Sequence, residues 1–73
     1  MKYAVEQRLR FIDFILDHYG YINRECVEDY FGISTPQVTK DIKEYMKLSP
    51  DNIFYSTSSK RYLKHPEFRR VWE

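Results

Sequence analysis

Apolar side chains recur every three or four positions over the first quarter of the chain, which is the spacing of one face of a helix. This pattern predicts a helix over residues 3–19, with an inner face made of Val5, Leu9, Ile12, Ile15, Leu16 and Tyr19. Gly20 is well placed to end the helix, because glycine readily adopts the left-handed backbone found after a last helical turn. Residues 21–22 are expected to form a short extended segment.

A second helical pattern starts at Asn23, a residue type that caps helix N-termini. It continues to a glycine at position 32, and its inner face is expected to carry Val27, Tyr30 and Phe31. The single cysteine, Cys26, is expected to be a small buried apolar residue of this helix rather than a reactive thiol. One cysteine also excludes an internal disulfide.

A third helical pattern covers residues 34–48. Ser34 and Gln37 have the spacing of a capping box, and Pro36 stands in the first turn, where its missing N–H costs little. The inward side is expected to hold Val38, Ile42 and Tyr45. The opposite side carries polar residues, namely Gln37, Lys40, Lys43, Glu44 and Lys47.

The pattern changes to alternation after a Ser-Pro-Asp-Asn turn at residues 49–52. Residues 53–57 and 61–64 predict a hairpin with a basic tip, and Tyr55 and Tyr62 are expected to pack across it. The fold class is therefore mainly α with a small β-hairpin, a winged helix-turn-helix of three helices plus a wing. We assign residues 1–65 to this domain and residues 66–73 to a C-terminal tail, or to the start of a linker or short helix.

Composition limits the classes of protein that need consideration. The chain has 73 residues, of which 42% are hydrophobic, enough for one small folded domain. No apolar run is long enough to span a membrane, and the first residues lack the core of a signal peptide. We therefore expect a cytoplasmic protein without a membrane partner.

Charge is distributed unevenly along the chain, although the formal net charge is only +1. Residues 1–32 carry four basic and six acidic side chains, whereas residues 33–73 carry eight basic and five acidic ones. Positive charge thus gathers on the third helix, the hairpin and the tail. This asymmetry favours a polyanionic partner such as nucleic acid.

A family resemblance rests on residues 23–45, which read NRECVEDYFGISTPQVTKDIKEY, and on the N-x-x-Y strand that follows. Over residues 8–68 the chain resembles the N-terminal winged helix-turn-helix of WYL-domain transcriptional regulators and, more loosely, DeoR-type repressors. The resemblance implies sequence-specific, usually repressive binding of palindromic double-stranded DNA by a homodimer. In that family a ligand-sensing domain follows, so no small-molecule site is expected in these residues.

The resemblance also implies which residues meet DNA. By position, the recognition helix contributes Ser34, Thr35, Gln37, Thr39 and Lys40, and the wing contributes Lys60 and Arg61. The chemistry of the side chains agrees, because glutamine pairs with adenine, lysine binds guanine and a helix N-terminus holds phosphate. Lys43 lies farther along and is expected to touch the DNA backbone. The alternative is that these are ordinary solvated surface residues.

Asp41, on the flank of the third helix, is expected to pair with a basic residue of an earlier helix. The first helix has a second apolar strip containing Phe11 and Phe14, and Trp72 adds to it from the tail. These three residues are expected to form a homodimer interface, unless the tail folds back over the first helix within one chain.

An enzyme is not expected from this sequence. His18 and His65 lack companions at metal-ligand or catalytic spacing, and there is no glycine-rich phosphate loop. No cofactor and no metal are therefore expected. The alternative to a DNA-binding regulator is a winged-helix module that binds another protein.

Overall fold

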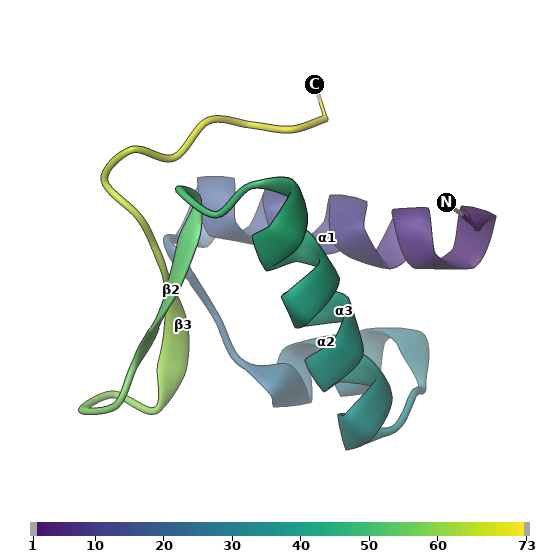
Figure 1. Cartoon of the computed structure of the whole chain (residues 1–73). Coiled ribbons are helices and arrows are strands. Elements are labelled where there is room, and N and C mark those ends of the chain that lie inside the picture. Colours follow the sequence, from purple (N-terminus) through teal and green to yellow (C-terminus); the bar gives the residue numbers. More distant parts are fainter. Residues whose placement is uncertain (1, 73) are drawn as a thin grey trace.

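The computed structural model describes residues 2–72; Met1 and Glu73 lie outside the described residues. The elements are α1 (Tyr3–Tyr19), β1 (Tyr21–Ile22), α2 (Arg24–Phe31), α3 (Thr35–Leu48), β2 (Ile53–Ser56) and β3 (Arg61–Lys64) (Figure 1). This order confirms the predicted winged helix-turn-helix, with three helices and a β-hairpin wing.

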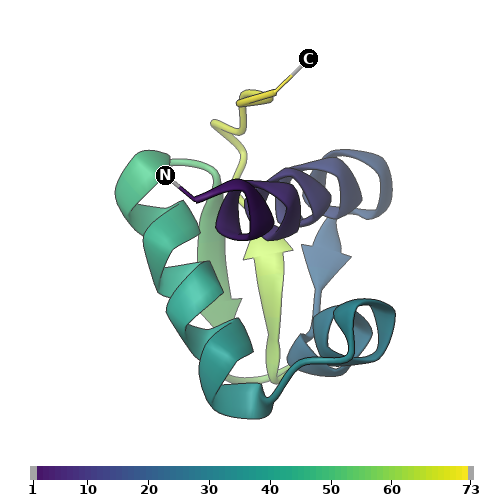
Figure 2. The same cartoon turned by 90° about the vertical axis from the view of Figure 1, so that its right-hand side faces the viewer.

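The sheet has three strands in the order β1-β3-β2, and both pairs are antiparallel. The extended segment after α1 therefore pairs with the wing, with Tyr21 opposite Leu63. Tyr55 and Tyr62 face each other across the wing with ring centroids 4.9 Å apart, as predicted. Figure 2 shows the three helices on one face of this small sheet.

The core lies between the helices and the sheet and is built from the predicted inner faces. Among residues 2–72, the core contains nine buried apolar side chains, namely Leu9, Ile12, Leu16, Ile22, Val27, Val38, Ile42, Tyr45 and Ile53. Burying large aliphatic and aromatic side chains is the main stabilising term in a domain of this size. Within residues 2–72, no helix is both long and apolar enough to cross a membrane.

Three residues predicted to face the core are exposed. Tyr19 and Tyr30 are 66% and 68% exposed, because Tyr19 ends α1 and Tyr30 lies at the edge of the α2 inner face. The Tyr30 ring instead stacks on Phe11 at 4.4 Å, which covers one ring face and leaves the hydroxyl in water. Cys26 is also exposed, so the expectation that it is buried is wrong. Among the described residues of α2, Val27 alone is fully buried.

The helix starts agree only in part with the sequence prediction. Asn23 caps α2 as predicted, accepting a 2.9 Å hydrogen bond from the backbone N–H of Cys26. Ser34 stands at the N-cap of α3, but its side chain makes no capping bond within residues 2–72. The predicted capping box is wrong: in such a box the Gln37 carbonyl oxygen accepts from the N-cap N–H, whereas here the Gln37 amide donates to Oδ1 of buried Asp41 at 3.0 Å, which holds the side chain there instead.

The C-terminal tail returns along α1 within the same chain (Figure 1). Its described part, residues 66–72, forms neither helix nor strand. Arg70 donates from Nε to Asp13 at 3.2 Å and from Nη1 to Asp17 at 3.1 Å, which ties the tail to α1. Of the two alternatives for the tail, the structure therefore shows the fold-back over the first helix.

Candidate nucleic-acid interface

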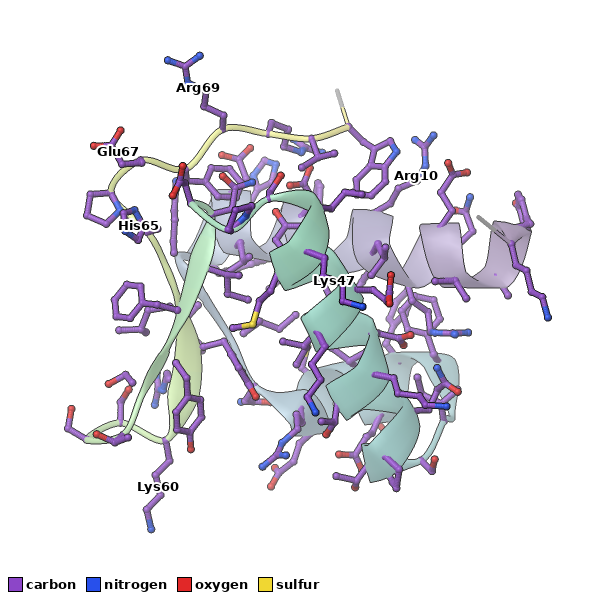
Figure 3. All side chains as sticks on the ribbon, in the orientation of Figure 1. Arg10, Lys47, Lys60, His65, Glu67 and Arg69 are labelled. Atoms are coloured by element: carbon purple, nitrogen blue, oxygen red, sulfur yellow. The ribbon has the colours of Figure 1, made fainter. Side chains whose placement is uncertain are left out.

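The outer face of α3 is a row of lysines. Val38, Asp41, Ile42 and Tyr45 are buried and define the inner side of this 14-residue helix. Lys40, Lys43 and Lys47 lie on the other side and are exposed, and Figure 3 shows Lys47 projecting from the helix. Lys47 makes an ion pair of 3.5 Å with Glu44 of the same helix, which is weak because both side chains are exposed.

The first half of α3 is held in place by Asp41, which is 1% exposed. The Arg8 guanidinium on α1 donates from Nε and Nη2 to the two carboxylate oxygens of Asp41. This confirms that Asp41 pairs with a basic residue of an earlier helix. Asp41 also accepts one N–H of Gln37 at 3.0 Å, so the second N–H and the carbonyl oxygen of that amide remain for a base.

The other flank of α3 faces α2. The Thr39 hydroxyl donates to the carbonyl oxygen of Thr35 at 3.1 Å and accepts from Nη1 of Arg24 at 3.4 Å. Arg24 was not predicted as a site residue. It is the first residue of α2, in the more acidic half of the sequence, and only the packing of α2 against α3 brings it to this surface.

A hollow of about 440 Å³ separates the wing from α2 and the start of α3. It is lined by Asn23, Arg24, Glu25, Glu28, Thr35, Ser59, Lys60 and Arg61. Lys60 extends from the tip of the wing, at the end of the molecule where α3 begins (Figures 1 and 3). The Arg61 guanidinium stands 4.5 Å from the centroid of the Tyr21 ring, a contact that holds it against β1.

The predicted site residues therefore form two groups around α3. Thr35, Lys60 and Arg61 line the hollow beside the wing, and the hydroxyl of Thr39 faces Arg24 on that flank. Gln37, Lys40 and Lys43 line a shallow groove of about 480 Å³ between α3 and the start of α1, which Lys2 also borders. Ser34 is exposed at the N-cap. Together they present cationic and hydrogen-bonding groups over one helix and the adjacent wing.

The predicted partner residues line a separate surface, here termed the aromatic hollow. It encloses about 360 Å³ and is lined by Gln7, Arg10, Phe11, Phe14, Tyr30, Phe31, Arg70 and Trp72. Arg10 lies 5.6 Å from the Trp72 ring and Arg70 lies 5.4 Å from the Phe14 ring, so cations border the rings. Phe14 remains 43% exposed although the tail packs beside it.

Comparison with known proteins identifies relatives over nearly the whole chain. Residues 4–72 match the family model described as the BrxR transcriptional regulator winged helix-turn-helix domain. Proteins named DNA-binding transcriptional repressor CapW are 45% identical in Escherichia coli strain KTE188, 42% in Pseudomonas aeruginosa and 38% in Stenotrophomonas maltophilia, each over 71 residues.

These alignments cover 97% of this chain and 24% of each relative, so the chain spans about a quarter of their length. The resemblance to a regulator winged helix, inferred from residues 23–45, is confirmed. The family description names a regulator and no enzyme, in agreement with the sequence-based expectation. The chain belongs to the family of BrxR transcriptional regulator winged helix-turn-helix domains.

Proposed function

We propose that this domain binds double-stranded DNA sequence-specifically and acts in transcriptional repression. The observation that carries the proposal is the exposed lysine row of α3, together with a basic wing that shares a hollow with Thr35 at the start of the same helix. A 14-residue helix is about 21 Å long, and its outer half fits the major groove of B-DNA. The CapW relatives, which are named as DNA-binding repressors, support the same function.

The start of α3 supplies the base-contacting groups in this proposal. Lys40 donates to guanine O6 and N7, and Gln37 pairs with the N6 and N7 edge of adenine. Asp41 holds the Gln37 amide in one orientation before DNA arrives, which lowers the entropy lost on binding. Ser34 and Thr35 place backbone N–H groups and hydroxyls beside a phosphate.

The phosphate-binding groups surround these base-contacting groups. Lys43 lies farther along α3 and meets the DNA backbone, while Lys60 and Arg61 reach phosphates or the minor groove from the wing. Arg24 joins them from α2, on the hollow beside the wing. Glu25 and Glu28 line the same hollow, so we expect the phosphates to follow its cationic side.

We further propose that the domain acts as a homodimer through the aromatic hollow, with Phe11, Phe14 and Trp72 in the interface. The tail folds back within one chain but leaves part of the aromatic strip uncovered, because Phe14 stays 43% exposed. An exposed aromatic cluster of this kind marks an association surface. A two-fold dimer would place two copies of α3 on half-sites about 34 Å apart. Sedimentation equilibrium tests this: Phe14→Ser should weaken association, whereas Phe54→Ser, at a similarly exposed phenylalanine of the wing outside the hollow, should not.

The proposal also covers where the protein acts and how the chain divides into a domain and a tail. A regulator of this kind acts in the cytoplasm, within the WYL-domain group of regulators that the sequence resembles. Residues 1–65 form the DNA-binding unit in this proposal, and residues 66–73 are assigned to a C-terminal tail or the start of a linker. No small-molecule site is assigned to these residues.

Fluorescence anisotropy of labelled duplexes against salt concentration tests the proposed function. The duplexes should include the region upstream of the protein's own gene. Lys43→Ala should weaken binding and make the slope of log K against log salt shallower by about 0.9, the value for one lost phosphate contact. Arg69→Ala removes the same charge from the tail, at the end of the molecule away from the tip of the wing, and should change neither (Figure 3).

Absence of binding at low salt, with protein at tens of micromolar, would contradict the proposal, since non-specific contacts are already detectable there. That result would favour the alternative, a winged-helix module that binds another protein. The aromatic hollow would then be the first surface to mutate.

A further inference from the structure

A buried carboxylate joins the C-terminal tail to the core. Asp13 of α1 is 0% exposed, an unusual position for an acidic residue. Its Oδ1 accepts a hydrogen bond from the Tyr45 hydroxyl of α3. Its Oδ2 accepts three more, from Arg70 Nε at 3.2 Å, Val71 N at 2.9 Å and Trp72 N at 3.1 Å. Three of the four bonds to this charge therefore come from the tail.

Asn52, which precedes β2, makes a second connection of the same kind. Its amide donates to the Arg69 carbonyl oxygen at 2.7 Å and accepts from the Arg69 N–H at 2.9 Å. The same Asn52 amide donates to the Tyr45 hydroxyl at 3.0 Å. Tyr45 thus lies between the two groups that hold the tail.

Tyr45 links these tail contacts to α3, because its hydroxyl bonds to both Asp13 and Asn52. It is 0% exposed, belongs to the last turn of the helix, and packs in the core beside Val38 and Ile42. Burial, followed by the hydrogen bond to Asp13, raises the pKa of Tyr45. The hydroxyl therefore stays protonated and remains a donor to Asp13 at neutral pH.

We infer that Asp13 and Asn52 are positioning residues that couple docking of residues 69–72 to the seating of α3, and so to DNA binding. The inference rests on the proposed function. The tail and the start of α3 lie at opposite ends of the molecule, so the coupling does not involve a DNA contact by the tail (Figure 1).

The physical reason is the cost of an unpaired buried charge. When the tail leaves, Asp13 keeps only the Tyr45 hydroxyl, and a buried charge that loses its partners is strongly destabilising. Water must then enter beside Asp13, or α1 and α3 must move apart. Each response disturbs the last turn of α3. Coupling between two sites is reciprocal. If docking of the tail raises the affinity for DNA by some factor, bound DNA must raise the equilibrium constant for docking by the same factor.

Two adjacent arginines provide a matched test. Arg70→Ala and Arg69→Ala each remove one positive charge from the tail, but of these two arginine side chains the one that bonds to Asp13 is Arg70. Arg70→Ala should lower the affinity for duplex DNA about five-fold or more, within the usual range of coupling between sites. Arg69→Ala should leave the affinity unchanged, and the two variants should have the same salt slope. Equal affinities in the two variants would overturn the inference.

A measurement without DNA separates this inference from the proposed function. The Ser49 N–H donates to the Tyr45 carbonyl oxygen at 2.9 Å and reports the end of α3. Hydrogen exchange of the Ser49 amide should be faster in Arg70→Ala than in Arg69→Ala. Amides that exchange only by global unfolding report the overall stability of each variant, and the increase at Ser49 should exceed the increase at those amides. Faster exchange at Ser49 with no DNA binding by the unmodified protein would refute the proposed function but support the coupling of tail and helix. Unchanged exchange would overturn the coupling, even if DNA binds.

A second pair of variants approaches the network from α3, in case Arg70→Ala fails to fold. Tyr45→Phe removes the hydroxyl that joins Asp13 to Asn52, and Tyr62→Phe is the matched control on the wing. Exchange of the Val71 and Trp72 amides should be faster in Tyr45→Phe by more than the change in global stability, and unchanged in Tyr62→Phe. Equal exchange in the two variants would overturn the inference.

Discussion

Removing the Tyr45 hydroxyl should destabilise the domain far more than an ordinary tyrosine-to-phenylalanine change. The Tyr45→Phe side chain keeps its shape in the core, so no cavity term contributes. It leaves Oδ1 of Asp13 without its donor and removes one acceptor of Asn52, which still has the Arg69 carbonyl oxygen. A hydrogen bond to a charged group contributes about 1.5–3 kcal/mol, so we expect the free energy of unfolding to fall by about that amount.

The assay is urea denaturation followed by circular dichroism and by the fluorescence of Trp72, the only tryptophan. A loss of about 1 kcal/mol lowers Tm by about 4–8 °C in a domain of this size, so thermal melting should show a drop of about 6–24 °C. Tyr62→Phe is the control and should stay within about 0.5 kcal/mol of the unmodified protein. If Tyr45→Phe is as stable as this control, the buried network does not stabilise the domain as described.

Four further predictions concern pH, an ion pair, the wing and a turn. The pKa of Tyr45 is raised in the folded state. Its protonated hydroxyl therefore contributes fully to stability below pH 10.0, and this contribution is lost as the pH rises further. Above pH 10.0, the free energy of unfolding should fall more steeply with pH in the unmodified protein than in Tyr45→Phe. Arg8→Met leaves buried Asp41 without its cation and should cost about 3–5 kcal/mol in urea denaturation, and a loss below 1 kcal/mol would argue against a buried ion pair. Lys60→Ala should leave the melting temperature unchanged and, in anisotropy titrations, make the salt slope of DNA binding shallower by about 0.9. Gly32→Ala, at a φ of 64°, should destabilise by about 1–2 kcal/mol in chemical denaturation because an alanine is strained there, although its Cβ meets open space.

The helices and the wing were predictable because their signals are local. The apolar period of α1, the Asn23 cap, and the glycines at positions 20 and 32 each act within a few residues of sequence. The outer face of α3 followed from the same period, since the positions opposite Val38 and Ile42 are lysines.

The buried polar network was not predictable for the opposite reason. Asp13 interrupts the apolar face of α1, and its partners come from Tyr45 and from residues 70–72, which are 32 to 59 positions away in sequence. Gln37 was assigned to a capping box because the box is a local motif, whereas its amide donates to Asp41, one helical turn later. The local sequence pattern does not predict which hydrogen-bond acceptors, such as the carboxylates of Asp13 and Asp41, become buried in the fold.

The candidate site also contains some residues that local sequence predicts and others that only the tertiary packing reveals. Lys40 and Lys43 could be nominated from residue type and helix phase alone. Arg24 could not, because its place beside Thr39 depends on how α2 packs against α3. The tail was left between two alternatives, since an aromatic strip has the same composition whether the tail or a second molecule covers it.

The most direct test of DNA recognition by α3 is a base-pair substitution scan of the tightest-binding duplex. Affinities should be measured for the unmodified protein, for Lys40→Ala and for Lys43→Ala. We expect Lys40→Ala to lose discrimination at one guanine-containing base pair, by about 1–3 kcal/mol, and to keep its preferences at the other base pairs. Lys43→Ala should weaken binding to every duplex by a similar factor. A Lys40→Ala protein that keeps the complete base preference of the unmodified protein would contradict the assignment of α3 as the recognition helix.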